Sequence, residues 1–139
     1  MTQINAYLTF DGNTAEAMEF YKECIGGELM ISKVGDSPVE EECSEAQKGL
    51  VMHAQLSKGS LMLMASDMIM GGELVRGNAT ALSLNCSSEE EIRGYFDSLS
   101  VGGSDIHPLK VEFWGALFGM FTDKFGVRWL LNFDQNTPH

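Results

Sequence analysis

The chain repeats itself once, and this repeat constrains its fold more than any other feature. The first copy, INAYLTFDGNTAEAMEFYKECIGG, starts at Ile4, and the second, TALSLNCSSEEEIRGYFDSLSVGG, starts at Thr80. Each copy opens with a short apolar run of strand type, continues with an amphipathic helix, and ends in Gly-Gly. Two copies of one supersecondary unit predict a fold built from two similar modules.

The helix start signals of the two copies share their chemistry. Asn13 and Ser88 are good N-cap residues, and Glu16 and Glu91 follow three positions later, where a carboxylate can complete a capping box. The offset is the same for both pairs, 88 − 13 = 75 and 91 − 16 = 75. The apolar faces of the expected helices are Met18, Tyr21 and Ile25 in the first copy, and Ile92, Tyr95 or Phe96, and Leu99 in the second.

Three segments of strand character follow each expected helix. They are residues 28–34, 50–56 and 60–65 in the first half, and 106–111, 115–122 and 127–133 in the second. The hairpins VMHAQLSKGSLMLMA and LFGMFTDKFGVRWLLNF superpose when Gly59 is laid on Gly126, an offset of 67. We therefore expect one α+β domain over residues 1–139, with two β-α-β-β-β modules at 1–66 and 79–139 and a connecting loop at 67–78.

Charge and composition argue against several classes of partner. The formal net charge is −11 and the pI is near 4.5, so polyanions such as nucleic acid or an anionic membrane surface would be repelled. No stretch approaches the roughly 20 apolar residues of a membrane-spanning helix, and MTQINAYLTF lacks the pattern of a secretory signal. We expect a cytoplasmic protein whose three widely spaced cysteines, Cys24, Cys43 and Cys86, are reduced.

Two polar loops interrupt the repeat. Residues 37–48 carry four glutamates without an apolar period, which predicts a solvated loop. Residues 65–78 join the halves and contain Met68, Ile69 and Met70, which are unexpected in a plain linker. This second loop is expected to cover either a cavity or a partner subunit, and the sequence leaves both possibilities open.

Three phrases, GNTAEAMEFY, VMHAQLSKGSLMLMASDM and FWGALFGMFTDKFGVRWLLN, carry a family resemblance across nearly the whole chain. The chain resembles the vicinal oxygen chelate superfamily, also called the glyoxalase/bleomycin resistance/dioxygenase fold. Within it the chain is similar to the PhnB-like branch, often labelled 3-demethylubiquinone 3-methyltransferase-like. The resemblance implies that the modules form a cupped mixed β-sheet with flanking helices, and that the protein is a homodimer.

The resemblance also implies where a metal would bind, because metal enzymes of this superfamily place ligands on the first and last strand of each module. Registering the repeats without gaps puts Ala6, Leu63, Ala81 and Leu130 at these positions, and none of their side chains can hold a metal. A methyltransferase would need a glycine-rich turn between a parallel strand and a helix, whereas the glycine pairs here follow helices. We therefore predict no metal and no cofactor.

A few polar residues are candidates for a site. His53 in VMHAQL shares a strand face with Gln55, and either a site histidine or a hydrogen-bonded structural histidine fits this position. Asp67, with Ser66 before it, closes the last strand of module one, where it can bind a polar group of a ligand or cap a turn. Arg76 and Arg128 suit an anchor for a carboxylate or phosphate, although Arg128 equally suits a surface position.

Methionine and aromatic residues give the stronger signal. Methionine suits surfaces that accept ligands of several shapes, and tryptophan offers a flat stacking face, although every strand must also bury one face in a core. Trp114 stands between Phe113 and Gly115, a place that suits the entrance of a pocket. The full set is Met52, Met62, Met64, Met68, Met70, Met120, Phe113, Trp114, Phe118, Phe121 and Trp129.

The leading hypothesis is a metal-free homodimer that binds a small apolar or aromatic organic molecule. The residues expected to contact it are His53, Met64, Asp67, Trp114, Phe118 and Trp129. One alternative is a lyase, isomerase or dioxygenase whose metal is held by non-standard ligands, such as His53 with carboxylates of the acidic loop. Another is a dimeric module whose site has filled with side chains and is inactive.

Overall fold

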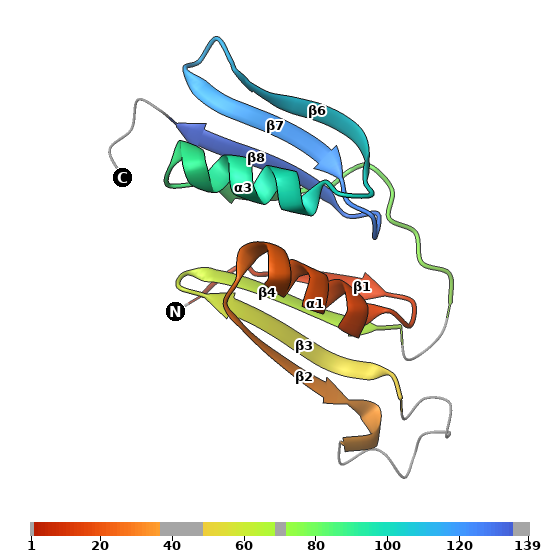
Figure 1. Ribbon diagram of the computed structural model, residues 1–139. Coiled ribbons are helices and arrows are strands. Elements are labelled where there is room, and N and C mark those ends of the chain that lie inside the picture. Colours follow the sequence, from red (N-terminus) through yellow and green to blue (C-terminus); the bar gives the residue numbers. More distant parts are fainter. Residues whose placement is uncertain (1, 37–48, 69–71, 135–139) are drawn as a thin grey trace. The chain divides into compact units, whose positions relative to one another are not determined.

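The computed structural model describes residues 2–36, 49–68 and 72–134, and within it the chain forms two compact units (Figure 1). The first unit is Met1–Val75 and the second is Arg76–His139. The division falls inside the connecting loop expected at 67–78. The expected acidic loop at 37–48 lies outside the described residues, as do Ile69 and Met70 of the expected linker.

Both units have the order β-α-β-β-β and a four-stranded mixed sheet, as the repeat predicts. The elements of the first unit are β1 (Ala6–Phe10), α1 (Thr14–Ile25), β2 (Glu28–Lys33), the short 3-10 turn η1 (Val34–Asp36), β3 (Val51–Lys58) and β4 (Leu61–Asp67). Those of the second are β5 (Leu82–Asn85), α3 (Glu89–Leu99), β6 (Ser104–Val111), β7 (Ala116–Thr122) and β8 (Arg128–Asp134). The strand orders are β1-β4-β3-β2 and β5-β8-β7-β6. In each sheet the first strand runs parallel to the last strand of its unit, and the other pairs are antiparallel.

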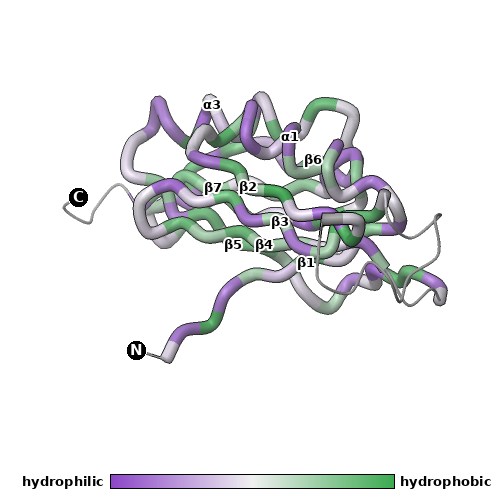
Figure 2. The backbone as a smooth tube through the Cα atoms, turned by 90° about the horizontal axis from the view of Figure 1, so that it is seen from below, coloured by the Kyte–Doolittle hydropathy of each residue, from purple (hydrophilic) through white to green (hydrophobic). Residues whose placement is uncertain are grey.

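The core of each unit lies between its helix and one face of its sheet (Figure 1). In the first unit the fully buried Met18 and Tyr21 of α1 belong to the same core as Leu56 of β3. In the second unit the rings of Phe96 in α3 and Phe121 in β7 make an edge contact, with their centroids 5.1 Å apart. Figure 2 shows hydrophobic residues along the strands and hydrophilic stretches on the helices, the pattern expected when a helix buries one side only.

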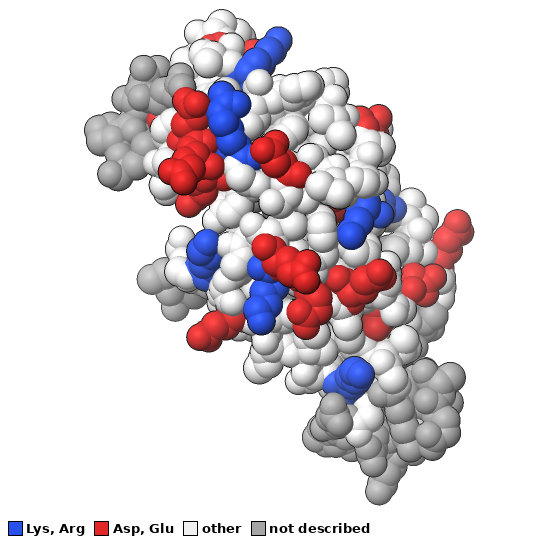
Figure 3. Space-filling model, in the orientation of Figure 1, with Lys and Arg blue, Asp and Glu red and all other residues white. Residues whose placement is uncertain are grey.

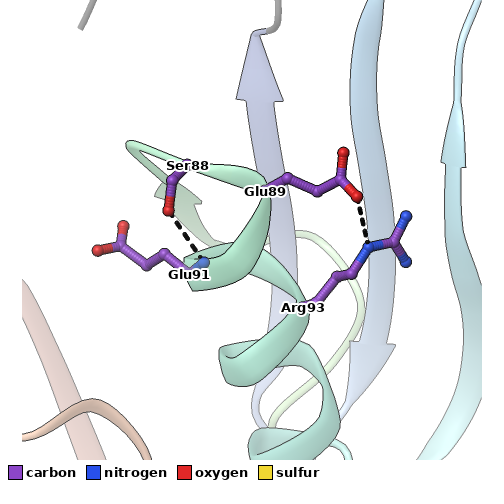
Figure 4. A network of polar contacts seen from close by, with 4 residues as sticks. All are labelled: Ser88, Glu89, Glu91 and Arg93. Atoms are coloured by element: carbon purple, nitrogen blue, oxygen red, sulfur yellow. Dashed lines mark hydrogen bonds and ion pairs between the residues drawn. The ribbon is translucent and has the colours of Figure 1, made fainter.

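The two helices begin in different ways. Ser88 caps α3 as predicted, because its Oγ accepts a hydrogen bond from Glu91 N at 3.0 Å (Figure 4). In return, Glu91 Oε1 accepts a hydrogen bond from Ser87 N at 3.0 Å. The expected cap at Asn13 is wrong, since its side chain makes no capping hydrogen bond. Asp67 from the end of β4 occupies this role instead, accepting from Thr14 N at 3.1 Å. The first helix is therefore capped by a residue that lies far along the sequence.

No helix among the described residues is long and apolar enough to cross a membrane.

Cys86, next to β5, is 4% exposed, and burial raises its thiol pKa from the ordinary 9.0 to about 12, with a smaller effect of the Glu91 carboxylate. Because the folded state keeps the proton that the unfolded state loses above pH 9, the free energy of unfolding should fall between pH 9 and 12. We expect a slope from this thiol of up to about 1.4 kcal/mol per pH unit. Denaturant titrations of the wild type and Cys86→Ala across this range would measure it. Cys24→Ala, at a half-buried thiol, is the control, and an equal slope in the wild type and Cys86→Ala would contradict the prediction.

Candidate functional site

Each sheet has one face covered by the helix of its unit, and we call the opposite face its helix-free face. Residues directly opposite in neighbouring strands share a face, so the strand register assigns every side chain to one of the two. Gly119 fixes the assignment in the second unit, because a Cβ added to it would lie 2.7 Å from Cε2 of Phe96 in α3. The helix-free face of that sheet therefore carries Ser83, Asn85, Ser104, His107, Lys110, Phe118, Met120, Thr122, Arg128, Leu130 and Asn132.

A pocket of about 410 Å³ opens at one end of this helix-free face. Its volume lies in the range of small-molecule sites, and its lining mixes polar and apolar groups. Arg128 at the start of β8 lines it and donates a hydrogen bond from Nη1 to the carbonyl oxygen of Asn78. The lining residues are Gly77, Asn78, Asp105, His107, Met120, Phe121, Thr122, Gly126 and Arg128.

The edge strand β6 brings two ionisable side chains to the pocket. Its pairing with β7 is irregular on both sides of His107, which lies opposite Met120. Asp105 sits within the first irregularity with φ at 51°, the left-handed region that aspartate tolerates better than most residues. His107 lies within the strand segment expected at 106–111, and β6 begins two residues earlier, at Ser104. Irregular pairing of this kind breaks the strict alternation of a strand, so the sequence of β6 does not show a simple polar and apolar pattern.

An aromatic strip leads along the same face to the pocket. The rings of Trp114 and Phe118 are in edge contact with centroids 5.9 Å apart, and Phe113 contacts Trp114 at 5.0 Å. Phe113 is 97% exposed and Trp114 50% exposed, so solvent reaches both rings. Phe118 and Met120 are two positions apart on β7, which places them side by side on the helix-free face at a spacing of about 7 Å. The strip Phe113–Trp114–Phe118 is thus continuous with the Met120 side of the pocket.

Two other predicted site residues, His53 and Met64, lie on the helix-free face of the first sheet. The ring of His53 is 5.9 Å from that of Tyr7, centroid to centroid, and His53 is opposite Ser32 in β2. Met64 is opposite both Tyr7 and Gln55. His53 and Gln55 therefore share a face, as the alternation of β3 predicts. These residues belong to the first unit, whereas the pocket and the aromatic strip belong to the second.

Asp67 is 5% exposed, and its carboxylate accepts four hydrogen bonds within the first unit. Oδ1 accepts from Gly12 N and Thr14 N at 3.1 Å each and from Thr14 Oγ1 at 2.6 Å, and Oδ2 accepts from Val51 N at 2.8 Å. The carboxylate thus connects the β1–α1 loop to the start of β3. This is the turn-capping role that the sequence left open for Asp67.

Trp129 is only 2% exposed and lies on the face of β8 that α3 covers. Its indole Nε1 donates to Oδ2 of Asp123 at 2.8 Å, and Oδ1 of the same carboxylate accepts from Phe125 N and Val127 N. The structure therefore does not bring Trp129 together with Trp114 and Phe118. Sequence reasoning missed Asp123, although an aspartate three residues before Gly126 is a typical turn signal.

The structure corrects the gapless register of the repeats. Ala6 is opposite Leu63, and both lie on the helix-covered face of the first sheet. Leu130, by contrast, is opposite Ser83 on the helix-free face of the second, and Ala81 precedes β5. For the last strands the cause is turn length, because β3 and β4 are joined by Gly59 and Ser60 alone, whereas residues 123–127 join β7 and β8.

After this correction the first and last strands face each other on the helix-free faces at four pairs, which are Tyr7 with Met64, Thr9 with Ser66, Ser83 with Leu130, and Asn85 with Asn132. None of these side chains is the histidine, glutamine or glutamate that the family resemblance implies for metal ligands at such positions. Within residues 2–36, 49–68 and 72–134, no group of three or more histidine, cysteine, aspartate or glutamate side chains is placed to hold a metal ion.

Comparisons with known proteins agree on a family. The model of the family described as 3-demethylubiquinone-9 3-methyltransferase matches residues 2–132. The crystal structure of PA1353 from Pseudomonas aeruginosa is similar over 98% of this chain and 100% of that one, with 40% identity and a TM-score of 0.86. The PhnB protein of Bacillus cereus is similar over 95% and 99%, with 28% identity and a TM-score of 0.74.

A more distant structure shares the fold alone. The glyoxylase/bleomycin resistance protein/dioxygenase domain from Frankia sp. EAN1pec is 13% identical, with a TM-score of 0.69 over 100% of this chain and 96% of that one. The paired β-α-β-β-β units, the family match and these neighbours lead to one assignment. The chain belongs to the PhnB-like family described as 3-demethylubiquinone-9 3-methyltransferase, and it shares its fold with structures of glyoxalase/bleomycin resistance/dioxygenase proteins.

Proposed function

We propose that this protein binds a small organic molecule with an aromatic or apolar body on the helix-free face of its second unit, without a metal. The observation that carries the proposal is the continuity of the exposed aromatic strip with a pocket of about 410 Å³. An aromatic ligand can stack on Trp114 or Phe118 while its other end enters the pocket past Met120. The polar groups of the lining would fix its orientation, as in most small-molecule sites.

The side chains expected to bind are Trp114, Phe118 and Met120, with polar groups from His107, Thr122 and Arg128. This set keeps two residues predicted from the sequence, Trp114 and Phe118. It omits Asp67 and Trp129, because their polar atoms already have partners inside their own units. His53 and Met64 remain candidates for a second contact surface on the first unit.

The two tryptophans allow a direct test, since one is half exposed and the other is 2% exposed. We would titrate the protein with 4-nitrobenzyl alcohol, a neutral aromatic quencher, and follow intrinsic fluorescence. We expect saturable quenching in the wild type and its loss in Trp114→Phe, where only the buried Trp129 emits. Met120→Arg, which puts a long charged side chain at the pocket, should weaken binding at least tenfold, although Trp114 is still present.

Met30→Arg is the matched control, because Met30 is a 55% exposed methionine on a strand of the first unit. It should bind the quencher like the wild type, and thermal melts would establish that all variants are folded. Quenching that rises linearly without saturation, or equal affinity in Met120→Arg and the wild type, would overturn the proposal and favour a filled, inactive face.

The homodimer and the absence of a metal remain part of this proposal. Native mass spectrometry of protein purified without chelator and soaked with zinc, nickel, manganese or iron(II) tests both together. We expect a metal-free dimer. One bound metal per subunit, lost in His53→Ala, would contradict the metal-free binder and support the alternative of a metal-dependent enzyme.

A further inference from the structure

We infer that the molecule bound in the pocket of the second unit is a monoanionic organic acid, with its carboxylate on Arg128 and a hydrogen-bond donor group facing Asp105. The inference rests on the proposed function and adds the chemical class of the ligand. It depends on the three ionisable residues of the pocket lining, which are Asp105, His107 and Arg128.

Arg128 supplies the cation. The whole chain has 9 basic residues against 20 acidic ones, and Figure 3 shows acidic side chains at several separate places on the face in view. The guanidinium of Arg128 therefore brings a positive charge to the pocket of a protein whose net charge is negative. Its hydrogen bond to the Asn78 carbonyl holds the guanidinium by one nitrogen, and a planar carboxylate matches the remaining edge of the fork.

Neighbouring side chains can complete a site for a carboxylate. Thr122 of β7 is directly opposite Arg128 of β8, so both side chains leave the sheet on the same face, and both line the pocket. His107 lines the pocket from β6 and offers an imidazole N–H. Arg128, Thr122 and His107 therefore present donors from three adjacent strands, a convergence that a neutral apolar ligand would not use.

Asp105 limits the charge that the pocket accepts. The negative charge of its carboxylate offsets the positive charge of Arg128. The pocket therefore has little net positive charge with which to bind a dianion such as a phosphate monoester. A monoanion that also carries a hydroxyl or amino group can satisfy both side chains at once. The left-handed backbone at Asp105, φ 51°, belongs to the irregular stretch of β6 that lines the pocket, and such local conformations gather at binding sites.

The test compares three aromatic probes of similar size: 4-hydroxybenzoate, the neutral 4-hydroxybenzyl alcohol and the dianionic phenyl phosphate. Binding is measured by two-dimensional ¹H–¹⁵N NMR titration of the full chain. We expect 4-hydroxybenzoate to bind at least fivefold more tightly than either other probe. Arg128→Gln should lower its affinity to that of the alcohol and leave the alcohol unchanged.

Two further variants make the result specific. Arg93→Gln is the matched control, because Arg93 is an exposed arginine of the same unit that pairs with Glu89 on α3 at 3.0 Å (Figure 4). It should bind all three probes like the wild type. Asp105→Asn keeps a residue type that tolerates positive φ while removing the charge, and it should improve phenyl phosphate binding relative to 4-hydroxybenzoate.

The outcomes separate this inference from the proposed function. Equal binding of 4-hydroxybenzoate and the alcohol, unaffected by Arg128→Gln, would overturn the anion inference while the proposed binding face stands. Tighter binding of phenyl phosphate to the wild type would overturn the preference for a monoanion. If none of the probes shifts the amides of β6, β7 or β8, both the inference and the proposed function fail.

Discussion

Asp67→Ala is expected to lower the free energy of unfolding by on the order of 3–5 kcal/mol, the largest effect of any single side-chain truncation proposed for this protein. The substitution removes one carboxylate and leaves four donors without it: Gly12 N, Thr14 N, Thr14 Oγ1 and Val51 N. Three of these bonds are made in the buried interior, where water cannot replace the lost acceptor. The start of α1 would lose its cap at the same time.

Urea denaturation followed by circular dichroism would measure the loss, and amide hydrogen exchange would localise it to residues 12, 14 and 51. Asp11→Ala is the matched control, because Asp11 is an exposed aspartate of the β1–α1 loop that Asp67 holds. This variant should change the free energy of unfolding by less than about 0.5 kcal/mol. Asp67→Asn keeps the size and part of the acceptor capacity, so an intermediate loss is expected. Equal stability of Asp67→Ala and Asp11→Ala would show that the carboxylate does not hold this loop.

The second large effect is expected at Gly103, just before β6. A Cβ added there would lie 2.2 Å from the carbonyl oxygen of Thr122 and 3.1 Å from that of Ser100. Both atoms are backbone, and Ser100 O already accepts a hydrogen bond from Gly103 N at 2.9 Å. The connection from α3 to β6 must therefore move, and we expect Gly103→Ala to cost on the order of 3 kcal/mol.

Gly94→Ala provides the opposite control in the same unit. Gly94 lies exposed inside α3, and an added Cβ meets nothing within 4 Å. Alanine there should stabilise the protein by about 0.5–1 kcal/mol, because glycine has the lower helix propensity. Thermal melts of both variants, which add the same methyl group, would test the assignment. A similar change in melting temperature for Gly103→Ala and Gly94→Ala would contradict the close contact between Gly103 and the backbone of Thr122.

The repeat was sufficient to predict the order of elements, because strand and helix signals recur at matching positions and local signals determine local structure. The cap at Asn13 failed for a non-local reason, since the acceptor that holds Thr14 comes from Asp67 at the end of β4. The offset of 67 between the hairpins failed because turns of different length join their strands. An alignment error of one residue moves every side chain of a strand to its other face. The gapless alignment therefore paired Leu63 with Leu130, although these residues lie on different faces of their sheets.

The candidate site was predictable only in part. Trp114 stood out because it lies between Phe113 and Gly115, Phe118 was one of the aromatic residues singled out with it, and the structure places their rings in contact. Asp105 and Asn78 gave no comparable signal, because polar residues in loops and bulges are common in any sequence. Trp129 was misleading, since a tryptophan in an apolar strand fits a core as well as a pocket. Its indole N–H partner, Asp123, becomes evident only when the turn is seen in three dimensions.

The parallel pairing of β1 with β4 and of β5 with β8 has a consequence for how the chain folds. In each sheet the first strand of the unit pairs with the last. Ala6 lies opposite Leu63, which is 63 − 6 = 57 residues later, and Leu82 lies opposite Trp129, which is 129 − 82 = 47 residues later. Contacts over such distances slow the search for the native state, because a long loop must close before the pairing stabilises it. During synthesis, β1 has no neighbour in its sheet until β4 has left the ribosome, and the same delay applies to β5 and β8. Each unit thus stays open until its last strand arrives.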